Sequence, residues 1–168
     1  MPNNIIQAFP KDFWEQEQSN IEFILTDDAP ADIPFTAVKM LLFDDHKLLL
    51  TKVPRGWDIP TGHKEEGEDI AEAVKRETLE ETGVVANQMI FIGYLKLIKA
   101  AQNEQNKKYP PVSAIGVFVC KDFTVSDFSE PLHEATERCF QEIDKIGEIH
   151  HSWSSLMESI MWYAYKHK

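Results

Sequence analysis

Two glycines and a run of carboxylates between residues 62 and 84 constrain this chain more than any other part of its sequence. The segment reads Gly-His-Lys-Glu-Glu-Gly-Glu-Asp-Ile-Ala-Glu-Ala-Val-Lys-Arg-Glu-Thr-Leu-Glu-Glu-Thr-Gly-Val. Its pattern predicts a loop followed by one helix. Within that helix, Glu77, Glu80 and Glu81 have the spacing i, i+3 and i+4, so they lie on the same face.

Carboxylates placed this close together repel one another, and a purely structural helix gains nothing from them. A hard divalent cation does, because Mg²⁺ binds carboxylate oxygens and keeps positions open for substrate phosphates. The alternative is an exposed, salt-bridged helix in which Glu72, Arg76 and Glu80 form i,i+4 pairs. That alternative explains the charges but leaves the flanking glycines unexplained, so the pattern favours a metal site.

The segment resembles the Nudix box, the signature of the Nudix (MutT-like) hydrolases. The family pattern is a glycine, five residues, a glutamate, seven residues and then R-E-U-x-E-E-x-G-U, in which U is aliphatic. The matching positions here are Gly62, Glu68, Arg76, Glu77, Glu80, Glu81, Gly83 and Val84. Two positions depart from the pattern: Thr78 replaces an aliphatic residue, and Thr61 stands where family members often have glycine.

The resemblance implies an α/β fold, namely an α/β/α sandwich with a central mixed β-sheet and the box as a loop–helix–loop motif. We expect residues 1–168 to form a single domain, with the box at 62–84. The remaining residues favour the same class, because strands are expected on both sides of the box helix. An amphipathic helix is expected from Ser152 to the end of the chain.

Apolar runs bounded by turn residues predict the strands of this sheet. They cover residues 20–25, 35–43, 47–53, 88–97 and 113–120. The second and third form a predicted hairpin through residues 44–46, and the last is apolar enough to be central. Asp69 followed by Glu72 predicts a capping box at the start of the box helix, and Gly83 predicts a left-handed cap at its end.

By resemblance, the chain hydrolyses the pyrophosphate linkage of a nucleoside diphosphate joined to another moiety. Nucleoside triphosphates, nucleotide sugars and dinucleotides belong to this class of small-molecule substrate. Mg²⁺ is the expected cofactor, with Mn²⁺ as an alternative, because a metal ion neutralises phosphate charge and lowers the pKa of a bound water. The alternative function is a non-catalytic nucleotide-binding sensor or regulator on the same fold.

The resemblance also assigns roles inside the box. Glu80 and Glu81 are expected as direct metal ligands, and Glu77 as a further ligand or as the general base. Arg76 is expected to hold a box carboxylate through a charge-assisted, bidentate pair. Glu68 is expected to orient the loop or to lie near the metal.

Further metal ligands are expected outside the box. The backbone carbonyl of Thr61 is one. Many family members also use an acidic residue from a later loop, and Glu134 is the best-placed residue for that role, with Glu130 and Glu137 as competitors. The alternative for each of these glutamates is a solvated surface position.

Two residues are expected to bind substrate. Arg55 lies just before the box, where it can reach a phosphate, and Tyr109 lies in a polar loop, where it can stack on a base. Exposed surface positions are the alternative for both. The pair His150 and His151 has no acidic or cysteine partner at ligand spacing, so no metal site is expected there.

Composition narrows the partners of the chain. The net charge of −11 argues against non-specific binding to nucleic acid, which requires a basic face. No apolar run is long enough to span a bilayer, and no signal peptide is recognised at the N-terminus. The two cysteines, Cys120 and Cys139, are expected to be reduced. We therefore expect a cytoplasmic protein, and the resemblance suggests a homodimer.

Overall fold

Three long strands form the centre of the molecule, which is seen here as a computed structural model that describes residues 8–127 and 135–168. They are β3 (Phe35–Asp44), β7 (Val84–Lys99) and β8 (Val112–Val125). Strand β8 pairs antiparallel with β7 and parallel with β3, so the sheet is mixed. The predicted central position of the last apolar strand is confirmed.

Shorter strands extend the sheet on both sides. Strands β2 (Ser19–Leu25) and β1 (Asp12–Trp14) follow at the β7 edge. Strands β4 (Lys47–Val53), β5 (Gly56–Asp58) and β9 (Glu137–Glu142) lie on the β3 side, where β4 pairs with both β5 and β9. The strand order is therefore β1-β2-β7-β8-β3-β4-β5, with β9 beside β4.

The predicted hairpin of β3 and β4 is present, but the two strands pair only next to their connecting turn. Strand β4 then diverges, which frees the edge of β3 around Val38 and Lys39. Strand β6 (Thr61–His63) pairs with this free edge, with Gly62 opposite Val38 and Thr61 opposite Lys39. The start of the box is thereby attached to a central strand.

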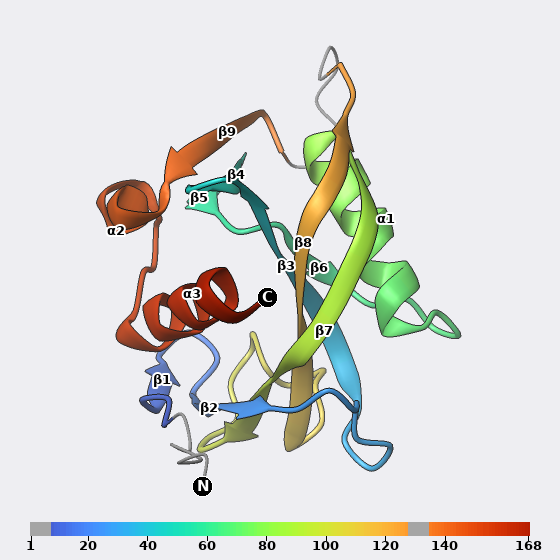
Figure 1. Cartoon of the computed structure of the whole chain (residues 1–168). Coiled ribbons are helices and arrows are strands. Elements are labelled where there is room, and N and C mark those ends of the chain that lie inside the picture. The colour runs from blue at the N-terminus through green and yellow to red at the C-terminus, as the bar shows by residue number, and fades with distance from the viewer. Residues whose placement is uncertain (1–7, 128–134) are drawn as a thin grey trace, which may run out of the picture.

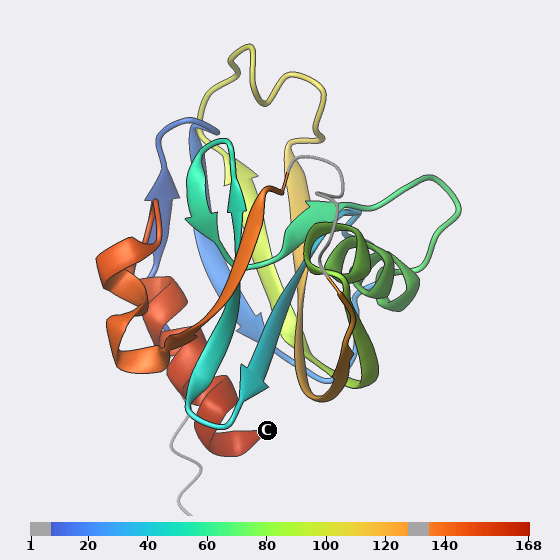
Figure 2. The same ribbon diagram turned by 90° about the horizontal axis from the view of Figure 1, so that it is seen from above.

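Helices cover both faces of the sheet (Figure 1, Figure 2). Helix α1 (Ile70–Thr82) lies on one face, and α3 (Ser155–His167) lies on the other, after the short η1 (Ile143–Lys145) and α2 (Ile146–Ile149). The expected α/β/α sandwich is confirmed. Among the described residues, none of the helices has the length and apolarity needed to cross a membrane.

Strand β3 shows why the sheet needs a helix on each face. Val38 and Met40 pack in the core beneath α1, whereas Leu41 and Phe43 pack in the core beneath α3. Successive side chains of a strand point to opposite faces, so a strand that is apolar at every position must be covered twice. All four side chains are at most 2% exposed.

The box helix begins and ends as its sequence predicts. The Asp69 carboxylate accepts hydrogen bonds from the amides of Ala71 and Glu72, both at 2.8 Å, and Glu72 accepts one from the Asp69 amide. At the other end Gly83 has φ 66°, and its amide donates to the Leu79 carbonyl at 2.8 Å. Local sequence signals were sufficient here because both caps are local interactions.

Two predicted strands are longer in the structure than in the sequence reading. Strand β7 starts at Val84, before residue 88, and β8 continues past residue 120 to Val125. Their ends pair with each other beyond the doubly covered core, where exposed polar residues hide the apolar pattern. The last helix starts at Ser155 rather than 152, because Ser154 caps it through the Met157 amide. Both cysteines are unpaired.

Candidate metal centre

Arg76 gathers three carboxylates of the box. Its guanidinium forms a bidentate salt bridge with Glu68, in which Nε donates to Oε1 at 2.8 Å and Nη2 donates to Oε2 at 2.9 Å. Its Nη1 donates to Glu77 at 2.8 Å and to Glu80 at 3.1 Å. Such charge-assisted bonds hold the side chains in fixed positions. The exposed-helix alternative expected i,i+4 ion pairs among Glu72, Arg76 and Glu80. The structure contains the pair between Arg76 and Glu80, as part of this larger network.

Glu68 ties this network to the loop before the helix. One of its oxygens accepts the Glu65 amide at 3.0 Å, and Arg76 also donates to the His63 carbonyl at 3.0 Å. The bonds from Arg76, followed by the Glu65 amide, lower the pKa of Glu68 to about 2. Glu68 therefore stays ionised at neutral pH and fixes the loop against α1.

Glu81 lies on the same helix face as Glu77 and is half-buried. Its Oε2 accepts the Thr61 amide at 3.3 Å. Burial, with smaller contributions from the carboxylates of Glu77 and Asp58, raises the pKa of Glu81 to about 8. A cation bound at this point would stabilise the charged form of Glu81.

Gly62 allows Glu77 to approach the loop closely. A Cβ atom at position 62 would lie 1.9 Å from Cδ of Glu77 and 2.0 Å from its Oε2. Any side chain here would therefore displace the Glu77 carboxylate. Glycine is needed at this position for close approach, and its φ is not in the left-handed region.

The donor set of Glu77, Glu80 and Glu81 consists of carboxylate oxygens, which are the ligands that Mg²⁺ and Mn²⁺ accept most readily. Arg76, the cation that pairs with Glu77 and Glu80, also pairs with Glu68, so one positive charge is shared by three carboxylates. The residues present therefore fit a hard divalent cation. Thr61 lies at the edge of this group, with its amide donating to Glu81.

The expected acidic ligands outside the box do not join this group within the described residues. Glu134 and Glu130 lie outside those residues. Glu137 lies in β9, is exposed, and pairs with Lys52 at 2.6 Å. Its role as a further ligand stays a prediction.

Tyr109 contacts the box loop. Its hydroxyl lies 2.7 Å from Nε2 of His63, and the two rings are nearly parallel, with centroids 6.1 Å apart. The Lys99 ammonium also donates to the Tyr109 carbonyl. The polar loop between β7 and β8 is therefore in contact with the box loop through His63.

A second group of charged residues surrounds Asp58, which ends β5 just before the box. We call it the Asp58 cluster; its other members are Lys39, Arg55, His150 and His151. Asp58 is 8% exposed and accepts His150 Nε2 at 3.1 Å and His151 Nε2 at 3.0 Å. Lys39 Nζ and Arg55 Nη2 lie 3.6 Å and 3.5 Å from its oxygens.

The environment of Asp58 keeps it charged. Burial alone would raise the pKa of Asp58, but Lys39, followed by the two histidines, outweighs burial and lowers that pKa far below its ordinary value. The sequence reading that His150 and His151 lack an acidic partner is wrong. Asp58 is 92 residues from His150, and only the fold brings them together.

Asp58, His150 and His151 bring three atoms that can act as metal ligands within 4.8 Å of one another. The hydrogen bonds argue against a metal there. The Ser152 amide donates to Nδ1 of His150 at 3.1 Å, so Nε2 carries the ring proton and donates to Asp58. A histidine ligand has the reverse arrangement, in which the second nitrogen donates outward. Lys39 and Arg55 also place positive charge beside Asp58, and this charge would repel a metal cation.

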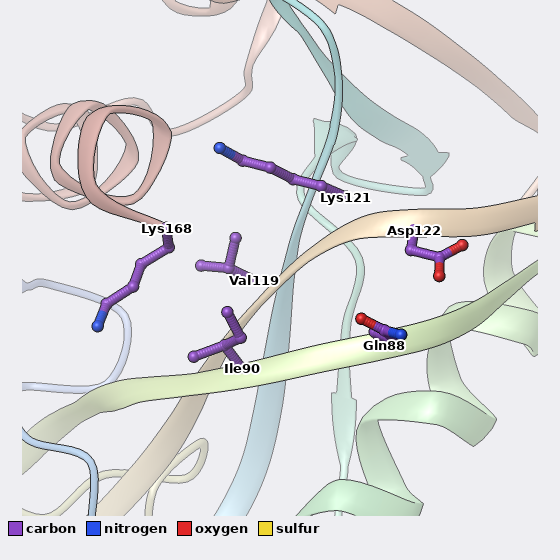
Figure 3. Close-up of a pocket in the computed structure, with 6 residues that line it drawn as sticks. All are labelled: Gln88, Ile90, Val119, Lys121, Asp122 and Lys168. Carbon is purple, nitrogen blue, oxygen red and sulfur yellow. The ribbon is translucent and has the colours of Figure 1, made fainter.

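A separate hollow lies beside strands β7 and β8 and the end of the chain after α3 (Figure 3). Its lining residues are Gln88, Ile90, Val119, Lys121, Asp122 and Lys168. Its volume is about 200 Å³. Small-molecule sites usually occupy about 300–1,000 Å³. It contains no residue of either charged group, so it is not the substrate site.

Comparisons with known proteins agree on one family. A family model described as the NUDIX domain matches residues 34–159, which include the whole box. The chain therefore belongs to the Nudix hydrolase family. An Arabidopsis thaliana protein named Nudix hydrolase 19, chloroplastic, is 30% identical over 89 residues, which are 51% of this chain and 20% of that protein. The match thus spans a small part of that longer relative.

Solved structures show the same fold. A variant of the Bacillus subtilis pyrophosphohydrolase BsRppH aligns with a TM-score of 0.61 and 18% identity, over 86% of this chain and 79% of that chain. A NUDIX hydrolase from Nitrosomonas europaea aligns with a TM-score of 0.59 and 26% identity, over 78% of this chain and 89% of that chain. Both similarities extend well beyond the box.

Proposed function

We propose that this chain is a Mg²⁺-dependent pyrophosphohydrolase acting on phosphorus anhydrides. The observation that carries the proposal is the grouping of Glu77, Glu80 and Glu81 on one helix face beside the half-buried loop at Gly62. Arg76 fixes two of these carboxylates, yet leaves the group negative. The family of the chain and the pyrophosphohydrolase among its structural neighbours support the same chemistry.

The chain's own residues divide the work as follows. Glu77, Glu80 and Glu81 would hold the metal, and Arg76 and Glu68 would keep their carboxylates and the loop in place. Mg²⁺, or Mn²⁺ in its place, supplies charge neutralisation at the phosphates and activates a water. Glu77 lies against Gly62, where it could act as a ligand or as the base that accepts a proton from the attacking water. No covalent nucleophile is required.

Substrate contacts belong to the rim of the site. Arg55 is 63% exposed on its side chain and is held near Asp58, where its remaining donors can bind a phosphate. Tyr109 is fixed on His63 and can stack on a base. The positions of Arg55 and Tyr109 support a substrate of the class of nucleoside diphosphates linked to another moiety. Its phosphates would face the box. The single domain, the cytoplasmic location, the absence of non-specific nucleic-acid binding and the homodimer stay predictions.

A substrate panel tests the proposal. The protein is incubated with nucleoside triphosphates, nucleotide sugars and dinucleotides, and released phosphate or pyrophosphate is measured with Mg²⁺, with Mn²⁺ and with EDTA. We expect metal-dependent release from one class. If no class is hydrolysed while a nucleotide still raises the thermal stability of the protein, the chain is the sensor of the alternative function.

A further inference from the structure

Lys39 is a buried cation that the proposed chemistry does not use. It lies on β3 and is 7% exposed. Its ammonium donates to the Thr61 hydroxyl at 2.6 Å and lies 3.6 Å from Oδ1 of Asp58. Burying an ammonium and a carboxylate costs several kcal/mol for each ion, and the gain from pairing does not always offset that cost. The pair therefore calls for a reason other than stability.

Thr61 connects this pair to the metal centre. Its hydroxyl accepts Lys39 and donates to the Ile59 carbonyl at 2.8 Å, while its amide donates to Glu81. A glycine at position 61, as many family members have, would offer no hydroxyl to Lys39. The departure from the family pattern at Thr61 thus creates a link between the Asp58 cluster and Glu81.

The far end of this link is fixed by the C-terminal part of the chain. His150 and His151, which follow α2, both donate to Asp58, and the Ile59 amide donates to its Oδ1 at 2.8 Å. The His151 amide also donates to the Trp57 carbonyl at 3.0 Å. Asp58 therefore has a fixed position from which it can orient Lys39.

We propose that Lys39 is a positioning residue of the metal centre: held by Asp58, it holds the Thr61 hydroxyl and so keeps the Thr61 amide against Glu81. The Asp58 cluster then acts on metal binding without contacting the metal. This inference rests on the proposed function, because it assumes that Glu81 is a ligand. It names a connection specific to chains with a hydroxyl at position 61.

The test measures Mn²⁺ affinity by titration calorimetry, which does not depend on turnover. In Lys39→Met, the Thr61 hydroxyl loses its donor, and we expect Mn²⁺ affinity to fall by about 10-fold or more, in the range for partners of metal ligands. Lys47→Met is the matched control, because Lys47 is a partly exposed β4 lysine that pairs with Glu142 at 3.8 Å. It should leave Mn²⁺ affinity unchanged.

A double-mutant cycle shows whether Lys39 acts through the hydroxyl of Thr61. Thr61→Val removes the hydroxyl with little change of volume, so it keeps the fold even if Lys39→Met does not. We expect Thr61→Val alone to weaken Mn²⁺ binding, and Lys39→Met to add almost nothing in that background. Thr61→Ser should restore wild-type affinity, since it keeps the donor and acceptor.

The outcomes separate this inference from the proposed function. Both the inference and the proposed function are supported if the wild type binds Mn²⁺, Glu81→Gln does not, and Thr61→Val binds it more weakly. If Thr61→Val binds Mn²⁺ with the same affinity as the wild type, the inference is overturned and the proposed function still stands. Fully additive effects of Lys39→Met and Thr61→Val also overturn it. Absence of Mn²⁺ binding to the wild type overturns the proposed function itself.

Discussion

The two charged groups of this molecule are built in opposite ways. Around Arg76, one cation is shared by several carboxylates, so the group is negative and can accept a further cation. Around Asp58, one carboxylate is shared by two cationic side chains and two histidines. The second group therefore needs no metal for charge balance.

The difference shows that proximity of ligand atoms is a weak guide to metal binding. Asp58, His150 and His151 have the residue types of a transition-metal site. Both histidines nevertheless donate to Asp58, and Lys39 and Arg55 already neutralise its carboxylate. In the box, the single charge of Arg76 is shared by Glu68, Glu77 and Glu80. The two groups are distinguished by their charge balance and by which atoms donate the hydrogen bonds, rather than by the distances between ligand atoms.

The largest expected effect comes from removing one charge at the box. Glu81→Gln keeps the shape of the side chain but removes a metal ligand, so we expect metal-dependent hydrolysis to fall on the order of 10³-fold, in the range for loss of a group that acts in the chemical step. Steady-state assays at saturating Mg²⁺ measure this. Activity within a few-fold of wild type would remove Glu81 from the metal centre.

The next effect tests the geometry of the box without changing its charge. Gly62→Ala places a methyl group where the Glu77 carboxylate lies, so the carboxylate must move. We expect kcat to fall about 100-fold, because displacements of about 1 Å at a reacting group have costs of this size. Circular dichroism should show a folded protein. Full activity of Gly62→Ala would mean that the position of Glu77 is unimportant.

Asp58→Asn tests the second group through stability. Two histidines and Lys39 would lose a charged acceptor, so we expect the free energy of unfolding at pH 7 to fall by about 1–3 kcal/mol. The pKa of Asp58 is lower in the folded chain than in the unfolded chain. Its stabilising contribution is therefore present above the unfolded pKa of about 4 and is lost at lower pH.

Denaturant titrations of the wild type and Asp58→Asn between pH 7 and pH 2.5 measure that contribution. The difference between the two proteins should shrink as the pH falls below about 4. A difference that stays constant over the whole range would show that the negative charge of Asp58 does not stabilise the fold.

The smallest effect sharpens the contrast between the groups. Arg76→Lys keeps the charge but cannot form the paired bonds to Glu68, so we expect a loss of about 1 kcal/mol of stability in EDTA. Saturating Mg²⁺ should narrow the stability difference between Arg76→Lys and the wild type, because a bound metal would hold the carboxylates that Arg76 otherwise fixes. The same Mg²⁺ should leave the stability difference between Asp58→Asn and the wild type unchanged. Equal rescue of both variants would contradict the distinction between the groups.

Sequence alone was enough for the box and for the layers of the fold. Asp69, Glu72 and Gly83 act on their immediate neighbours, so their pattern determines both ends of α1. Thr78, which departs from the family pattern, is buried, and its hydroxyl donates to the Val74 carbonyl at 2.7 Å. A buried threonine can therefore take the aliphatic position by bonding to its own helix.

The Asp58 cluster could not be predicted in the same way. Its members come from β3, from the turn between β4 and β5, from the end of β5, and from the segment between α2 and α3, so no spacing in the sequence relates them. The one local signal is a charged residue between Trp57 and Ile59, within an otherwise apolar strand end. Such a buried aspartate requires partners, but only the fold identifies them.

The contrast between the two groups can be tested most directly by locating a metal in the molecule. Crystals of the protein are soaked separately in Mn²⁺ and in Zn²⁺, and anomalous difference maps are calculated for each. We predict a Mn²⁺ peak among the oxygens of Glu77, Glu80 and Glu81, and no peak of either metal between Asp58, His150 and His151. A peak at Asp58, or no peak at the box, would contradict the account.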